Sequence, residues 1–131
     1  MGYRTNIINE THENENFRKV LFTGARSQLV VMHIPAGGEI GMETHEHVEQ
    51  TLFFLSGSGK AILNGAESAI GAGDVVVVPP GTRHNILNDS SEPLKVYTVY
   101  APANHIDGRV HGTKADADAD KEDERFGHEA Q

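Results

Sequence analysis

The chain lacks cysteine and tryptophan, and it has no long hydrophobic run. The absence of cysteine excludes a disulfide framework, an iron–sulfur cluster, a cysteine-based zinc finger and a thiol nucleophile. The longest apolar stretches, residues 52–55 and 75–78, are far shorter than the roughly 20 residues that a membrane helix needs. The N-terminal residues do not form the apolar stretch of a signal peptide, so we expect a cytoplasmic protein without a membrane partner.

Positive charge is also scarce. The 131 residues contain 11 Lys and Arg against 19 Asp and Glu, which gives a formal net charge of -8 at pH 7. Binding to a phosphate backbone needs clustered Lys and Arg, so we expect no nucleic-acid partner. Residues 113–131 contain seven acids, three bases and one large apolar residue, Phe126. Such a segment has little apolar surface to offset its ordering entropy, and we expect an acidic tail that is disordered or forms a short solvated helix.

The middle of the chain is rich in short segments of β-type residues that are separated by turn residues. The expected strands are 18–22, 28–34, 50–55, 60–64, 67–70, 74–79, 82–87 and 94–100. Asn64-Gly65 is typical of a two-residue type I′ hairpin. This spacing predicts an all-β sandwich or barrel over 17–112, between an N-terminal extension (1–16) with a brief helix near 10–17 and the acidic tail (113–131).

Residues 73–88 are the most informative stretch. Gly73, Pro79, Gly81, His84 and Asn88 follow the pattern G(X)5PXG(X)2H(X)3N without a break. This pattern is the second sequence motif of the cupins, so the chain resembles the cupin superfamily. The resemblance implies an antiparallel double-stranded β-helix, the jelly-roll cupin barrel, in which the histidine of the motif is a metal ligand. Runs such as 17–24, 28–32, 76–85 and 94–100 also resemble small single-domain bacterial cupins called mannose-6-phosphate isomerase-like, a label that does not establish isomerase activity.

The first cupin motif, G(X)5HXH(X)3,4E(X)6G, fits upstream without a gap when it is anchored on Gly57. The opening glycine is then Gly37, and Glu43, His45 and Gln50 occupy the positions of the motif's His, His and Glu. This register implies the ligand set Glu43, His45, Gln50 and His84.

A rival register takes His45 and His47 as the histidine pair and gives a three-histidine site with Gln50 and His84. It leaves only two residues before Gln50, where the motif has three or four, and it places Glu39 at the opening glycine. We favour the first register and keep His47 as the alternative ligand.

Oxygen and neutral nitrogen donors of this kind suit a divalent transition metal, and Zn, Mn, Fe or Ni are the candidates. Side chains alternate between the two faces of a strand, so Leu52, Phe54 and Ile86 are expected to line the pocket beside Gln50 and His84. A partly apolar cavity around a metal is typical of small-molecule sites.

We therefore expect a metal-dependent enzyme that acts on a small, sugar-like substrate as an isomerase, lyase or dioxygenase. Glu43 and Glu49 are candidates for a general base if they are not metal ligands. The sequence alone does not assign a catalytic residue. The strands around the motifs offer only Lys60, Arg83 and Lys95 to meet a phosphate, which argues against a phosphosugar. The alternative is a non-catalytic cupin that binds a small ligand or a metal.

Two further expectations concern the surface. The valine run 75–78 does not alternate with polar residues, and together with strand 18–22 it offers apolar faces that a small barrel cannot cover alone, so we expect a homodimer. His12, His105, His111 and His128 lie in polar stretches without matching partners, and we expect no role for them.

Overall fold

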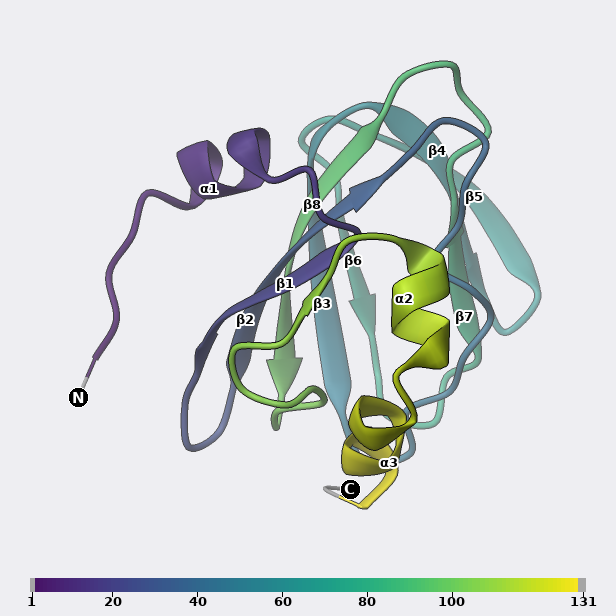
Figure 1. Ribbon diagram of the computed structural model, residues 1–131. Coiled ribbons are helices and arrows are strands. Elements are labelled where there is room, and N and C mark those ends of the chain that lie inside the picture. Colours follow the sequence, from purple (N-terminus) through teal and green to yellow (C-terminus); the bar gives the residue numbers. More distant parts are fainter. Residues whose placement is uncertain (1, 130–131) are drawn as a thin grey trace.

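In the computed structural model, which describes residues 2–129, the chain forms two antiparallel sheets that pack face to face (Figure 1). The elements are α1 (Ile7–Glu13), β1 (Arg18–Thr23), β2 (Gln28–Ile34), β3 (Glu49–Ser56), β4 (Ser58–Leu63), β5 (Ala66–Gly71), β6 (Val75–Val78), β7 (His84–Leu87), β8 (Leu94–Ala101), β9 (Val110–His111), α2 (Lys114–Ala119) and α3 (Lys121–Glu129). One sheet has the order β6-β3-β8-β2-β1-β9, and the other has the order β5-β4-β7. Within the described part of the chain, no helix is long and apolar enough to cross a membrane.

The expected all-β jelly roll is confirmed, and each strand expected from the sequence corresponds to an observed one. The hairpin at Asn64-Gly65 is also confirmed, because both residues have positive φ (48° and 85°) and Leu63 pairs with Ala66 across the turn. Strand β9 was not expected, since two residues are too few to give a pattern.

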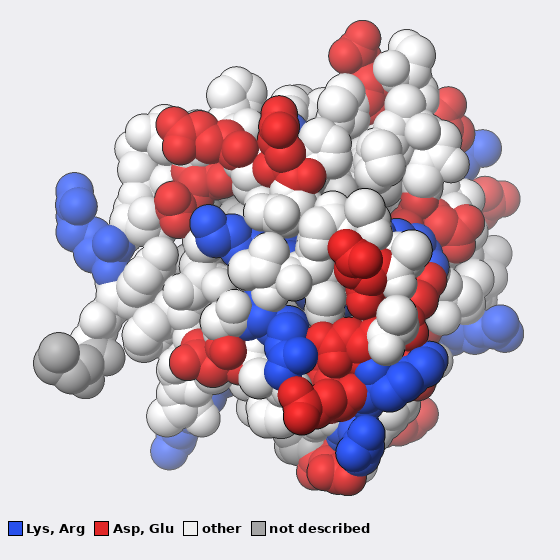
Figure 2. Space-filling view, in the orientation of Figure 1, with Lys and Arg blue, Asp and Glu red and all other residues white. Residues whose placement is uncertain are grey.

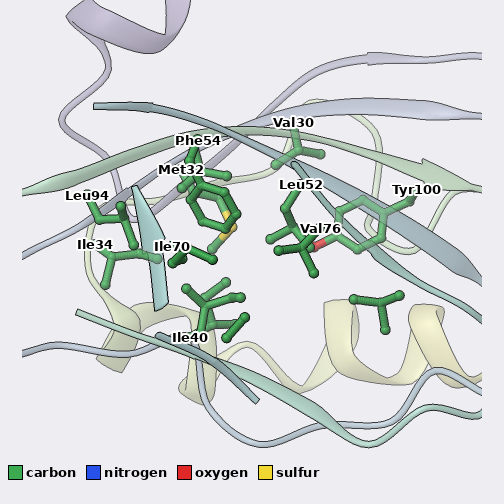
Figure 3. Packing of buried hydrophobic residues seen from close by; sticks show 14 of the residues in the cluster. Val30, Met32, Ile34, Ile40, Leu52, Phe54, Ile70, Val76, Leu94 and Tyr100 are labelled. Atoms are coloured by element: carbon green, nitrogen blue, oxygen red, sulfur yellow. The ribbon is translucent and has the colours of Figure 1, made fainter. Parts of the chain in front are cut away.

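The core lies between the two sheets and follows the alternation of the strands (Figure 3). Along β8 every second residue is buried, from Leu94 through Val96 and Thr98 to Tyr100. Each sheet contributes fully buried residues to this core, for example Leu52 from β3 and Ile86 from β7.

Strand β6 forms one edge of the six-stranded sheet and also alternates. Val76 and Val78 are buried, whereas the side chains of Val75 and Val77 are 53% and 49% exposed. The valine run therefore has one face in the core and one apolar face on the outside of the sheet.

Up to residue 129 the acidic C-terminal segment forms the two helices α2 and α3, which corrects the expectation of a disordered tail and confirms the helical alternative. Thr113 begins α2 with a capping box that involves Asp116. Asp123 and Gly127 of α3 are buried against the rest of the molecule. Acidic side chains and interleaved Lys and Arg gather over these helices in Figure 2. A count of apolar residues misses this docking, because it depends on polar contacts with the segment before β9.

Asn88, the last residue of the second motif, ties the end of β7 to β2. Its side-chain Nδ2 lies 2.9 Å from the carbonyl oxygen of Ile34, 3.1 Å from that of Pro35 and 2.8 Å from that of Glu92. The carbonyl oxygen of Pro35 also accepts from Gly38 N and that of Glu92 from Ser90 Oγ, so the buried carbonyl of Ile34 is the group that relies most on this amide.

We expect Asn88→Ala to lower the free energy of unfolding by about 1–3 kcal/mol, because it removes the side-chain donor to the buried carbonyl of Ile34. Chemical denaturation measures the change. Asn9→Ala, which truncates an exposed asparagine on α1, is the control and should change stability little. Equal effects of the two substitutions would contradict the role given to Asn88.

Candidate metal centre

An isolated β-bridge joins the irregular segment after β2 to β7. Glu43 N donates to His84 O at 3.0 Å, and His84 N donates to Glu43 O at 2.9 Å. Two residues further on, His45 O accepts from Gly81 N at 2.7 Å. The two cupin-like motifs, which are far apart in the chain, are thereby paired through their backbones, and the side chains of Glu43 and His84 emerge side by side.

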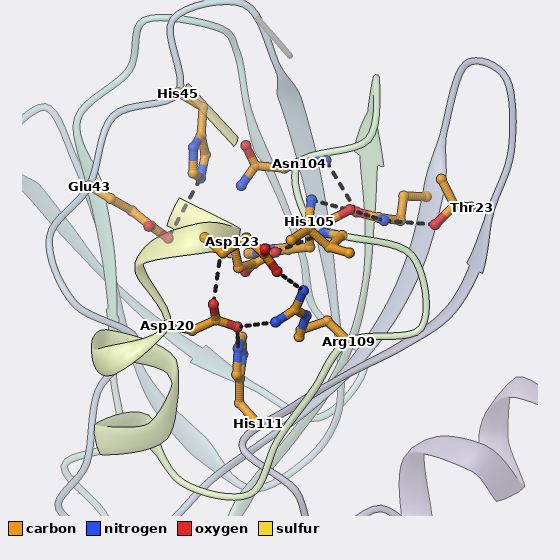
Figure 4. A network of polar contacts seen from close by, with 12 residues as sticks. Thr23, Glu43, His45, Asn104, His105, Arg109, His111, Asp120 and Asp123 are labelled. Atoms are coloured by element: carbon orange, nitrogen blue, oxygen red, sulfur yellow. Dashed lines mark hydrogen bonds and ion pairs between the residues drawn. The ribbon is translucent and has the colours of Figure 1, made fainter. Parts of the chain in front are cut away.

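Three ligand-type side chains converge at this bridge. Glu43 Oε1 lies 3.6 Å from His45 Nε2 and 4.0 Å from His84 Nε2, and the two imidazole centroids are 5.2 Å apart. Figure 4 shows the carboxylate of Glu43 and the ring of His45 pointing toward one another. Both histidines are buried, and the side chain of Glu43 is 34% exposed. The spacing of these atoms is suited to holding one ion.

The hydrogen bonds of His84 determine which of its nitrogen atoms is free to bind a metal. Nδ1 lies 2.9 Å from the carbonyl oxygen of Thr82, and because a carbonyl only accepts, Nδ1 carries the hydrogen. Nε2 then keeps its lone pair, and burial lowers the pKa of the ring, which favours the neutral form. A neutral imidazole oriented by a carbonyl through its other nitrogen is the usual form of a metal-binding histidine.

Glu43 is ionised at neutral pH. Burial by itself raises the pKa of this carboxyl group, but the interaction with His45 and the charges of Arg18 and His84 outweigh burial and hold the pKa at about 2. The cluster therefore offers one carboxylate and two imidazole nitrogens.

Gln50 supplies a fourth candidate donor. Its Nε2 donates to Thr98 Oγ1 at 3.2 Å, whereas its Oε1 is buried without a hydrogen-bond partner. Gln50 and Tyr100 are direct partners across β3 and β8, and the ring centroid of Tyr100 is 6.0 Å from that of His45. His47 is exposed and does not belong to the group formed by Glu43, His45 and His84.

A cavity of about 350 Å³ opens beside Glu43 and His45. Its walls come from β1, the segment 40–45, Asn104 and His105, and the two C-terminal helices. The three apolar residues expected to line the pocket lie elsewhere: Leu52, Phe54 and Ile86 are packed in the hydrophobic core. The cavity is consequently more polar than the sequence suggested, and its walls include acidic side chains of the C-terminal segment.

Two carboxylates fasten the C-terminal helices over this cavity. Asp123 Oδ2 accepts from His105 Nδ1 at 2.7 Å, and its Oδ1 accepts from Ile106 N at 2.7 Å. Asp120 Oδ2 lies 3.0 Å from Arg109 Nη1 and 2.9 Å from His111 Nε2 (Figure 4). The expectation that His105 and His111 have no partners was wrong, because their partners lie further along the chain, in the acidic C-terminal segment.

His111, Asp120 and Asp123 also lie close enough together to be considered as a second ion site. Both carboxylates are already engaged, and the guanidinium of Arg109 beside Asp120 repels a cation. We interpret this group as the contact that holds α2 and α3 in place.

Arg18 is a pocket residue that the sequence reasoning missed. It is the one lysine or arginine among the buried residues of the segment 2–129, and it lines the cavity with Glu43 and His45. Alternation along β1 carried the signal: Val20 points into the core, so Arg18 must point inward as well.

Comparisons with known proteins agree with this fold. The family model described as "Cupin domain" matches residues 30–100. The uncharacterized protein YrkC of Bacillus subtilis (strain 168) is 39% identical over 118 residues, which are 86% of this chain and 63% of YrkC, so the chain spans less than two thirds of that relative. The crystal structure of BH2720 from Bacillus halodurans superposes with a TM-score of 0.89 at 36% identity, covering 91% of this chain and 95% of BH2720. An oxalate-binding protein of Thermotoga maritima is 32% identical over 68 residues, 52% of this chain and 56% of that protein.

His105 couples the stability of the fold to pH. Burial and the charge of Arg18 lower its pKa from 6.5 to about 4, although Asp123 opposes this change. Between these two values the unfolded chain binds the proton and the folded chain does not. The free energy of unfolding should therefore fall as the pH falls through this range, by at most about 1.4 kcal/mol per pH unit from this one group.

The measurement is chemical denaturation at several pH values between about 7 and 4. We expect His105→Gln to flatten the dependence, because the buried titrating group is gone. His128→Gln, which replaces an exposed histidine on α3, is the control and should keep the dependence of the parent protein. Identical slopes for all three proteins would show that His105 is not the group responsible.

Proposed function

The chain belongs to the cupin domain family, and on that basis we propose that it is a metal-binding cupin that takes a small organic ligand into the cavity beside Glu43 and His45. We propose Glu43, His45, Gln50 and His84 as the ligands of one divalent transition metal ion. His47 remains the alternative ligand, and its exposed position outside the converging group favours the first register.

One observation carries this proposal. His45 Nε2, His84 Nε2 and Gln50 Oε1 are all buried and without a hydrogen-bond partner among the described residues. A buried polar atom left unpaired costs about 1–3 kcal/mol, so a ligand that accepts the lone pairs of these atoms is favourable for the fold. An ion that accepts all three lone pairs, together with the carboxylate of Glu43, removes this cost. Mixed nitrogen and oxygen donors fit Mn, Fe, Ni or Zn.

An ion held by these residues would supply a Lewis acid for a carbonyl or carboxylate oxygen of the ligand. The chain itself supplies the surroundings. The Thr82 carbonyl orients His84, and α2 and α3 exclude water from one side of the cavity. These features support an enzyme of the isomerase, lyase or oxygenase type.

A second candidate function is ligand binding without turnover. The relative in Thermotoga maritima that is named an oxalate-binding protein favours this function, although only half of the present chain aligns with it. Incubation of the metal-loaded protein with small acids and sugars, followed by product analysis, separates the two candidates, because a binding protein returns every compound unchanged.

The ligand set can be tested by metal analysis of the purified protein and of three variants. We expect about one ion per chain in the parent protein. His84→Ala and His45→Ala should each weaken binding by about tenfold or more, since even loss of an outer hydrogen bond to a ligand has effects of that size. His47→Ala, the matched control, should bind as the parent does.

Two results would contradict this assignment. Full metal content in His84→Ala would show that the ion is bound elsewhere. A loss in His47→Ala as large as that in His45→Ala would establish the three-histidine register instead.

We also propose that the chain forms a homodimer through the outer face of the six-stranded sheet. Val75 and Val77 are half exposed there, next to Phe53 and Tyr97, whose rings stack at 4.8 Å. An apolar face of this kind is costly in water and gains stability when a second copy covers it.

Light scattering at micromolar concentration should therefore give twice the chain mass of 14.2 kDa. Val77→Lys should shift the protein toward the monomer, because it places a charge in the proposed interface. Ser68→Lys, at an exposed position of β5 in the other sheet, should remain dimeric. A parent protein with the mass of a single chain would contradict the proposal.

A further inference from the structure

Arg18 is an unusual residue to find at the wall of this cavity. It lies on β1 between Met32 of β2 and His111 of β9, and its side chain points between the sheets. It is only 7% exposed. Long charged side chains are rarely buried to this extent unless a charge of opposite sign pairs with them.

Within residues 2–129 no carboxylate forms a direct ion pair with Arg18, although Glu43 and Asp123 line the same cavity. The ion pairs formed there do not include Arg18, and its Nε is buried without a hydrogen-bond partner. The guanidinium carbon lies 5.2 Å from the ring centroid of Phe17, which supports the group without neutralising it. Arg18 also interacts with the side chain of Tyr100, and this interaction opposes the rise in the pKa of Tyr100 that burial causes.

A buried guanidinium that forms no direct ion pair and lines a cavity is suited to binding an anion. Its planar fork of donors matches the two oxygens of a carboxylate. We propose that Arg18 binds the carboxylate of a small organic acid, and that the rest of this acid extends through the cavity toward Glu43 and His45. The proposal deepens the proposed function, because the metal ion would be the second anchor of the same ligand.

The charges around the cavity favour a carboxylate over a phosphate. Glu43, Asp118, Asp123 and Glu124 all line the walls, and Arg18 is the one Lys or Arg among the residues that line it. Because these carboxylates outnumber the one guanidinium, they repel a phosphate dianion more strongly than a carboxylate monoanion that pairs directly with Arg18. The scarcity of Lys and Arg around the motifs, which already argued against a phosphosugar, also favours a carboxylate over a phosphate.

The size of the cavity limits the acid. At about 350 Å³, closed on one side by α2 and α3, it lies near the lower end of the range for small-molecule sites. We therefore expect short-chain acids to bind better than long ones.

The first test uses the full-length protein without substitution. Calorimetry with glycolate, lactate and 3-hydroxybutyrate, each compared with its uncharged amide, isolates the contribution of the carboxylate, and inorganic phosphate serves as the rival anion. We expect the acids to bind more tightly than their amides and than phosphate. Equal binding of acid and amide, tighter binding of phosphate, or no binding of any of the three acids would overturn the proposal.

The second test uses variants. Arg18→Gln should weaken acid binding by about 10- to 100-fold, the usual range for loss of a charge-assisted hydrogen-bonding pair, and should leave binding of the amides unchanged. Arg18→Lys keeps the charge without the fork and should bind with intermediate affinity. Arg83→Gln removes an exposed arginine and should bind as the parent does.

Unfolding curves confirm that each variant is folded. If Arg18→Gln does not fold, Arg18→Lys and the comparison of acids with amides still decide the question. Parent-like affinity in a folded Arg18→Gln protein would contradict the role of Arg18.

Both tests are run on metal-free and on metal-loaded protein, so that the two proposals can fail separately. Loss of acid binding in Arg18→Gln with metal content unchanged supports the arginine anchor. If the protein takes up no metal but still binds acids in a way that depends on Arg18, the metal centre is contradicted and the proposal for Arg18 is supported. If the protein takes up metal but binds acids no better than their amides, the proposal for Arg18 is contradicted and the metal centre is supported.

Discussion

The backbone bridge between Glu43 and His84 is the contact on which the site depends. Two hydrogen bonds, of 3.0 and 2.9 Å, join an irregular segment to a strand that is distant in the chain. Because the two residues are direct partners across an antiparallel bridge, their side chains leave the backbone on the same face. The bridge thus delivers a carboxylate and an imidazole to one point, and His45, whose carbonyl is held by Gly81, adds the second imidazole.

The C-terminal segment completes the site from outside the β-structure. Asp120 and Asp123 hold α2 and α3 against the segment 105–111, and this places acidic side chains on the walls of the cavity that Arg18 also lines. The cavity is therefore lined by the metal-ligand candidates Glu43 and His45, by the buried guanidinium of Arg18 and by polar side chains of α2 and α3. This arrangement supports the proposal that the ligand is a short organic acid.

Much of the fold was predictable from the sequence, because short-range patterns carry it. Alternation gave the strands, Asn64-Gly65 gave a hairpin, and the fixed spacing of residues 73–88 gave the family. The convergence of Glu43 and His84 was predicted only through the motif, because no local sequence pattern indicates a β-bridge between residues so far apart in the chain. The docking of the acidic helices and the position of Arg18 were missed for a related reason. Both depend on pairings between distant polar residues, and a count of charges along the chain treats such residues as solvated.

The most direct test of this account is a crystal structure of the metal-loaded protein with diffraction data collected on both sides of the metal's absorption edge. The account predicts one anomalous peak per chain, within bonding distance of Glu43, His45 and His84 and with Gln50 Oε1 turned toward it. A peak at His47, a peak between His111 and Asp120, or no peak in protein that retains metal in solution would contradict it.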